Sequence, residues 1–124
     1  MTSARAFVAP IFLATAIGVA SGTALAHAFL DHAVPAVGST VHAAPRSVRL
    51  WFTERLEPAF SRVRVFDASG KPVDGGDSHV DASDPSILSV ALPPLPAGSY
   101  RVAWRVVSAD THVTEGDFTF DVAP

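Results

Sequence analysis

The sequence predicts an all-β protein folded as a sandwich of two sheets. Short runs in which apolar and polar residues alternate recur along the chain. Clusters of glycine and proline separate these runs, as turns do between antiparallel strands. No segment keeps its apolar residues at a sustained helical spacing. This pattern over about 100 residues is typical of one sandwich with about seven short strands.

Five runs are expected to form strands, and the run 99–107 shows the pattern most clearly. Every second residue from Tyr100 to Val106 is large and apolar, and the residues between them include two arginines. Such alternation indicates a half-buried strand with one face toward a core and the other toward water. The expected strands are 47–52, 62–66, 86–92, 99–107 and 117–122. The polar segment 74–86, rich in glycine and aspartate, is expected to be a long exposed loop.

The N-terminal segment has the three parts of a signal peptide in order. Arg5 supplies a positive charge, residues 6–20 are apolar apart from one threonine, and a triplet of the form Ala-x-Ala ends at Ala26. An uncleaved membrane anchor is the alternative, since the apolar stretch carries no charge. Its strongly apolar part is only about 15 residues long, however, and contains Pro10. We therefore expect cleavage after Ala26.

This cleavage divides the chain into a signal peptide, 1–26, and one domain, 27–124. Arg5 leaves with the peptide, so the domain keeps eight of the nine Lys and Arg residues against twelve acidic residues. The mildly acidic balance argues against nucleic-acid binding. The chain has no cysteine and its one methionine is Met1, so the domain offers no sulfur ligand to a soft metal ion.

The segment SADTHVTEG places Asp110 and His112 two residues apart between two expected strands. In extended backbone, residues i and i+2 point the same way, so a carboxylate and an imidazole would share one side. Cleavage after Ala26 would make His27 the N-terminus, whose amine and ring nitrogen can chelate one ion. Three nitrogens and one oxygen suit Cu(II) better than other divalent ions. By spacing alone, however, a turn-forming aspartate and a surface histidine are the commoner meaning of such a pair.

Three segments of the domain resemble the CopC family of periplasmic copper-binding proteins. HAFLDHAVPAVGSTVHAAP opens with histidine and a Pro-Ala-x-Gly turn, and VRLWFTERLEPAFSRVRVFDASG resembles the family's next strand pair. LPPLPAGSYRVAWRVVSADTHVTEGDFTFDV resembles its C-terminal third, in which W-R-V-V-S-x-D-x-H is the most specific motif. The resemblance covers almost all of the domain. It implies an immunoglobulin-like Greek-key sandwich located in the periplasm.

The same resemblance implies a Cu(II) site. Its ligands would be His27 through amine and imidazole, Asp110 through an oxygen, and His112 through imidazole. Glu54 matches a family glutamate near the metal and is expected to orient the amine or a histidine ring, although a plain surface carboxylate is the alternative. His32 lies close to His27 in the sequence and remains an alternative ligand.

The chain departs from one branch of the family, whose members carry a methionine-rich loop that holds Cu(I). The corresponding stretch, 68–86, contains His79 but no methionine. One Cu(II) site is therefore expected, without a Cu(I) site. His42 is expected to be a surface residue, and Trp51 and Trp104, which stand on opposite registers of their strands, are expected to serve packing.

The expected function is that of a copper carrier, which sequesters Cu(II) outside the cytoplasm in copper homeostasis or resistance, or passes it on. By resemblance its partner would be a CopD-like membrane transporter or a multicopper oxidase, and the carrier would be a monomer. An enzyme is the alternative, because copper on an N-terminal histidine also resembles the histidine brace of polysaccharide monooxygenases. Asp110 would fill a position that an oxygen-activating copper keeps open, so no catalysis is expected. A sandwich that merely adheres to another molecule is a third interpretation.

Overall fold

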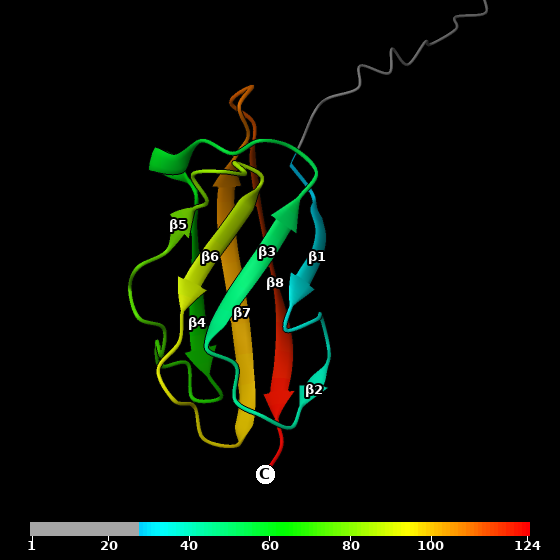
Figure 1. The fold of residues 1–124 in the computed structure, drawn as a ribbon, viewed down its shortest axis with the longest axis vertical. Helices are drawn as coiled ribbons and strands as arrows, with labels where there is room; N and C mark the ends of the chain where they lie inside the picture. The colour runs from blue at the N-terminus through cyan, green and yellow to red at the C-terminus, as the bar shows by residue number, and fades with distance from the viewer. Residues whose placement is uncertain (1–27) are drawn as a thin grey trace, which may run out of the picture.

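The structure, a computed structural model, describes residues 28–124, so the expected cut after Ala26 and the expected ligand His27 lie outside the described residues. Two four-stranded sheets pack face to face along the long axis of the molecule (Figure 1). A short 3-10 turn, η1 (Pro58–Phe60), lies at one end. Residues 28–124 contain no helix long and apolar enough to cross a membrane. The predicted all-β sandwich is confirmed.

The two sheets exchange strands along the chain, as in an immunoglobulin-like Greek-key sandwich. The β3 sheet contains, in spatial order, β1 (Leu30–Val34), β3 (Ser47–Phe52), β6 (Ile87–Ala91) and β5 (His79–Val80), all antiparallel. The β8 sheet contains, in spatial order, β2 (Thr40–Val41), β8 (Val113–Val122), β7 (Gly98–Val107) and β4 (Arg62–Asp67). In the β8 sheet β2 runs parallel to β8, and the other pairs are antiparallel. The connections from β3 to β4 and from β6 to β7 therefore cross from one sheet to the other.

All five predicted strands are present, and the structure adds three short ones, β1, β2 and β5. β2 and β5 contain two residues each, too few to show a period. β1 hides its alternation because its pairing with β3 shifts register between Leu30 and His32, as in a β-bulge. The strand predicted at 117–122 begins earlier, at Val113. Its first half was missed because a threonine and a glycine interrupt the row of large apolar residues there.

The core lies between the sheets, where the inward-facing residues of β3, β4, β7 and β8 gather. Val48 and Leu50 of β3 and Val102 of β7 belong to one cluster and are fully buried. Tyr100, near the start of β7, is also buried, and its hydroxyl donates to the Pro96 carbonyl at 2.5 Å. A tyrosine that bonds back to the backbone a few residues upstream recurs in immunoglobulin-like domains. The residues selected by alternation thus form the core that holds the two sheets in place.

The two tryptophans pack on opposite faces of their sheets, as predicted from their registers. Trp51 lies on the outer face of the β3 sheet, where its ring stacks on His32 with centroids 4.4 Å apart. The guanidinium carbon of Arg49 lies 5.3 Å from the centroid of the Trp51 ring. Trp104 packs against the core, and a Cβ atom at Gly116 would clash with its ring. Glycine at position 116 therefore makes room for the indole.

The outer edge of β4 is covered by the loop that follows it. The Val65 amide donates to Asp74 Oδ2 at 2.9 Å. The Val63 amide donates to Ser78 Oγ, also at 2.9 Å. Side-chain oxygens thus stand where a neighbouring strand would place its carbonyls. An edge that is satisfied in this way offers no free row of amides to another chain.

This loop corrects the expectation that all of 74–86 is exposed. The Asp74 side chain is 1% exposed, and its carboxylate lies 2.9 Å from Arg64 Nε. Asp77 Oδ1 accepts from the Ala91 amide of β6 at 2.8 Å, so the loop bonds to both sheets. The prediction was wrong for these residues because aspartate and glycine favour turns in general. Here the carboxylates satisfy backbone amides of two strands instead.

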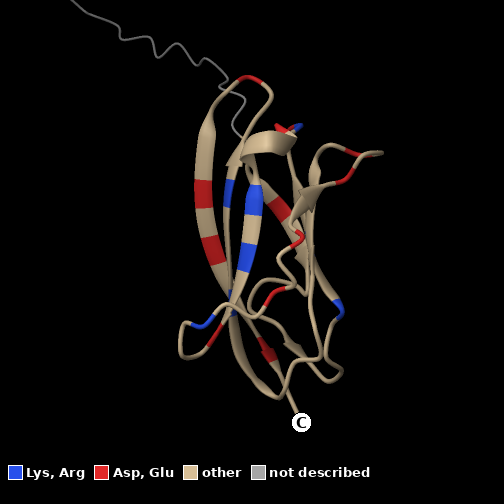
Figure 2. Ribbon diagram, turned by 90° about the vertical axis from the view of Figure 1, so that its left-hand side faces the viewer, with Lys and Arg blue, Asp and Glu red and all other residues tan. Residues whose placement is uncertain are grey.

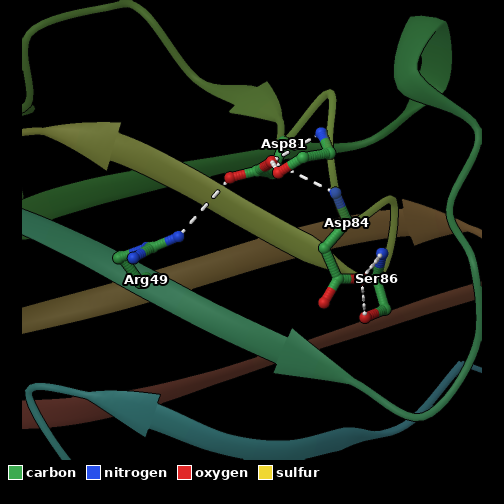
Figure 3. A network of polar contacts seen from close by, with 5 residues as sticks. Arg49, Asp81, Asp84 and Ser86 are labelled. Carbon is green, nitrogen blue, oxygen red and sulfur yellow. Dashed lines mark hydrogen bonds and ion pairs between the residues drawn. The ribbon is translucent and has the colours of Figure 1, made fainter.

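The end of the same segment is ordered by aspartates that accept hydrogen bonds from residues just after them (Figure 3). Asp81 Oδ1 accepts from the Ser83 and Asp84 amides at 2.8 and 3.1 Å. Asp84 Oδ1 accepts from the Ser86 amide at 3.1 Å. Arg49 of β3 approaches Asp81 Oδ2 at 3.5 Å (Figure 3). The hydrogen bonds from Ser83, hydroxyl first and amide second, lower the pKa of Asp81.

The outer face of the β8 sheet separates its charges by strand (Figure 2). β4 and β7 present arginines, and β8 presents acidic residues. Arg105 Nε lies 3.2 Å from Glu115 Oε1. Arg101 Nη1 lies 3.6 Å from Asp117 Oδ2. Because these side chains are exposed, each pair contributes at most about 1 kcal/mol.

Candidate metal centre

The loop between β7 and β8 forms a tight turn at the end of the sandwich where β1 begins (Figure 1). The Ser108 amide donates to the His112 carbonyl at 2.9 Å, and the Thr111 amide donates to the Ser108 carbonyl at 2.8 Å. Thr111 has a φ of 73°, in the left-handed region that β-branched residues rarely adopt. This conformation reverses the chain within five residues, from Ser108 to His112.

The turn is attached to the segment that leaves β3. The Ala109 amide donates to the Arg55 carbonyl at 2.8 Å, and Leu56 forms an isolated β-bridge with Ser108. Leu56 is 3% exposed and belongs to the core cluster. The turn is therefore attached to the segment after β3, next to the core cluster that contains Leu56.

Asp110 and His112 meet in this turn. Asp110 Oδ1 lies 3.1 Å from His112 Nδ1, and both side chains are about 40% exposed. The sequence predicted that they would share one side because of extended backbone. The structure brings them together for a different reason, since the backbone turns at Asp110 and Thr111. Their role as ligands stays a prediction.

Ser108 holds the Asp110 carboxylate by a hydrogen bond. Ser108 is 1% exposed, and its hydroxyl donates to Asp110 Oδ1. This hydrogen bond is the largest cause of a lowered pKa of Asp110, and the hydrogen bond with His112 is the second largest that lowers it. The carboxylate is therefore ionised at neutral pH and keeps an anionic oxygen beside a ring nitrogen, which is a donor pair suited to a divalent cation.

Glu54 lines a hollow together with Asp110. A small hollow of about 120 Å³ is lined by Glu54 and Arg55 on one side and by Ser108, Ala109 and Asp110 on the other. The glutamate thus shares a cavity with the proposed oxygen ligand. Its expected task, orienting a ligand, stays a prediction.

His42 is exposed, as predicted, and His32 and His79 have other partners. His32 Nδ1 lies 2.7 Å from Asp31 Oδ2, and its ring stacks on Trp51 on the outer face of the β3 sheet. His79 Nδ1 donates to the Asp77 carbonyl at 2.8 Å on β5. Across residues 28–124, no three His, Cys, Asp or Glu side chains gather as a metal site would require. Neither His32 nor His79 therefore joins Asp110 and His112 within this part of the chain.

The first described residues are held next to the turn. The Ala28 carbonyl accepts from Thr114 Oγ1 at 2.8 Å, and Ala28 is 1% exposed. The Phe29 amide donates to Thr53 Oγ1 at 3.0 Å, and the Thr53 amide donates to the Phe29 carbonyl at 2.9 Å. Residues 28 and 29 therefore bridge the end of β3 and the start of β8.

The sequence analysis missed Thr53 and Thr114. One signal for Thr114 was present, because it occupies an inward-facing position in the alternation of β8. A polar residue at such a position needs a hydrogen-bond partner. The partner, Ala28, lies 86 residues away along the chain, so no local pattern identifies it.

Comparisons with known proteins identify the family to which this fold belongs. The model of the CopC domain matches residues 30–123. "Copper resistance protein C" of Escherichia coli is 39% identical over 107 residues, which cover 81% of this chain and 84% of the relative. "Copper transport protein CutJ" of Bacillus subtilis is 32% identical over 101 residues, which cover 81% of this chain but 19% of that longer protein.

Two solved structures share the fold. The crystal structure of CopC from Methylosinus trichosporium OB3b matches with a TM-score of 0.71 and 39% identity, covering 79% of this chain and 95% of that one. PcoC from Escherichia coli, described as a methionine-rich copper resistance protein, matches with a TM-score of 0.70 and 39% identity, covering 78% of this chain and 99% of that one. With a matching domain model and relatives at this identity, the chain belongs to the CopC family of copper resistance proteins.

Proposed function

We propose that this protein is an exported, periplasmic Cu(II)-binding protein that carries or sequesters copper in homeostasis or resistance. It holds one ion through the amine and imidazole of His27, a carboxylate oxygen of Asp110 and the imidazole of His112. Signal-peptide cleavage after Ala26 is part of the proposal, because the amine exists only after that cut. Relatives named for copper resistance and copper transport support the choice of cargo.

The observation that carries the proposal is the attachment of Ala28. Its carbonyl is bonded to Thr114, which lies two residues beyond His112 on the same strand end. Because consecutive Cα atoms are about 3.8 Å apart, this attachment of Ala28 would keep a ligand at position 27 near the turn. A histidine at that point has the reach to share an ion with Asp110 and His112.

The described donor pair fits an ion of this kind. Two donors at right angles, each about 2.0 Å from one ion, are about 2.8 Å apart. Asp110 Oδ1 and His112 Nδ1 are 3.1 Å apart. A small movement of the two side chains would therefore place both atoms on adjacent corners of a square around one ion. An amine, two imidazoles and a carboxylate suit the tetragonal preference of Cu(II). PcoC is described as methionine rich, whereas this chain has one methionine, Met1, which supports the absence of a Cu(I) site.

A carrier is favoured over an enzyme. The four donors would occupy the square around copper, and Asp110 would take the position where oxygen activation needs an open site. Glu54, which shares a hollow with Asp110, would orient the donors. The alignment with a fifth of a longer copper transport protein supports delivery to a membrane transporter of the CopD kind, with a multicopper oxidase as the alternative recipient. The carrier would act as a monomer.

Removing either described ligand should weaken copper binding. We expect Asp110→Ala and His112→Ala each to raise the Cu(II) dissociation constant at least tenfold and to change the copper spectrum. His32→Ala and His79→Ala are matched controls, since both histidines lie elsewhere on the surface. Competition titration and electron paramagnetic resonance measure the two effects. A His112→Ala variant with an unchanged spectrum would reject the assignment.

Proton competition and metal preference give a second test. Free amines titrate near pH ~8 and imidazoles near ~6.5, so binding should weaken as the pH falls from about 8 to about 5. Asp110 contributes little over this range because its pKa is lowered by Ser108. Competition titrations should show Cu(II) bound more tightly than Zn(II), and Cu(I) bound poorly. Cu(I) bound as tightly as Cu(II) would favour the monooxygenase alternative.

A further inference from the structure

We propose that Thr114 is a positioning residue for copper. Its hydroxyl ties the N-terminal segment to the strand that carries the other two ligands, and this bond sets the Cu(II) affinity. The inference rests on the proposed function, and it adds a residue that is not itself a ligand.

The hydrogen bond joins two parts of the molecule that belong to different sheets. Phe29 is bonded to Thr53 by two hydrogen bonds and thereby extends the pairing of β1 with β3. Asp110 and His112 lie in the turn of the β8 sheet. Thr114 connects the two by donating to the Ala28 carbonyl at 2.8 Å. A shift between the sheets at this end would therefore separate the ligands.

The hydroxyl is not needed for the strand itself. Thr114 pairs with Val106 of β7 through backbone atoms, and a valine of the same shape suits a strand equally well. The Ala28 carbonyl, however, belongs to a residue that is 1% exposed. A buried carbonyl without a donor is costly, so losing the hydroxyl would displace the segment rather than leave it in place.

Displacement of this segment would weaken Cu(II) binding. Binding is tight when the donors already stand in the bound arrangement, because little order is then lost on binding. A segment held only by the β3 sheet has to be ordered by the metal. We expect Thr114→Val to weaken Cu(II) binding roughly threefold to tenfold, as the loss of one neutral hydrogen bond does.

Two further variants separate positioning from stability. Thr114→Ser keeps the hydroxyl and should bind Cu(II) within about twofold of the wild type. Thr119→Val makes the same substitution on the exposed face of β8 and should leave the affinity unchanged. The readouts are Cu(II) competition titration, the unfolding midpoint of the metal-free protein, and hydrogen exchange at the Phe29 amide. Faster exchange at Phe29 in Thr114→Val alone would show the segment released.

A double-mutant cycle with His27→Ala gives the sharpest test. If Thr114 acts by placing His27, the effect of Thr114→Val should be clearly smaller in His27→Ala, where the imidazole is lost and only the amine of residue 27 remains as a donor. The same loss in both backgrounds, or wild-type affinity in Thr114→Val, would overturn the inference. If the His27→Ala variant bound Cu(II) as tightly as the wild type, the proposed function itself would be overturned. The two failures are therefore distinguishable.

Discussion

One residue added ahead of His27 is expected to weaken Cu(II) binding by roughly 10²–10⁴-fold, since chelation by two linked donors is lost. The extension converts the amine into an amide, which no longer offers a free lone pair. The imidazole remains, but it then binds as a single donor beside Asp110 and His112. Isothermal or competition titration of the extended and native chains measures the effect.

The matched control adds the same residue after Pro124. The proposed copper ligands lie at the end of the sandwich that contains the turn between β7 and β8, whereas the C-terminus lies at the opposite end (Figure 1). The control should therefore bind Cu(II) like the native chain, and both extended forms should unfold at the same temperature. Equal affinity for the native and N-terminally extended chains would rule out the amine as a ligand.

Replacing Asp74 is expected to produce the largest loss of stability. Asp74→Ala leaves the Val65 amide without its acceptor and removes the partner of Arg64, at the edge of β4. The free energy of unfolding should fall by about 3 kcal/mol, since the carboxylate is buried and its hydrogen bonds are charge-assisted. Urea unfolding measures the loss. Asp117→Asn is the control, because its ion pair with Arg101 is exposed and should contribute less than about 1 kcal/mol.

The same carboxylate predicts a pH dependence. Burial raises the pKa of Asp74, but the hydrogen bonds from the Val65 amide, Arg64 and the Gly76 amide outweigh it and lower the pKa. A lowered folded pKa means stability that is present above the unfolded value, about 3.9, and lost as the pH falls through the folded value. The wild type should therefore exceed Asp74→Asn in its free energy of unfolding by a constant amount near neutral pH, and this difference should shrink below about pH 4. A constant difference across this range would contradict the assignment.

The fold was predictable where one face of a strand is buried along its whole length. β3 and β7 alternate strictly, because each has a core face and a solvent face, and both were located from this pattern. β2 and β5 were missed since two residues cannot show a period. The loop that covers β4 was misjudged because its stability comes from Asp74 and Ser78 bonding to distant amides, which no composition reveals.

The candidate centre was predictable in part. The spacing of Asp110 and His112 indicated a donor pair, and the structure places their donor atoms 3.1 Å apart. The predicted reason for their proximity was wrong, because a turn through Thr111 in the left-handed region brings Asp110 and His112 together, and not extended backbone. Thr114 was not identified, since its partner Ala28 comes from the far end of the chain.

On the proposed function, the hydrogen bond between Thr114 and Ala28 would also determine when copper can be bound. It closes a loop of 86 residues, so it forms only after nearly the whole chain has been assembled. If the chain is exported unfolded, as proposed, His27 and His112 would lie far apart and would form no chelating site during transit. Copper would thus select completely folded molecules and, by binding them alone, shift the folding equilibrium toward them after export. On the proposed function, the expected order of events is translocation, cleavage, folding and then capture of the metal, because the first and last strands meet at the proposed site.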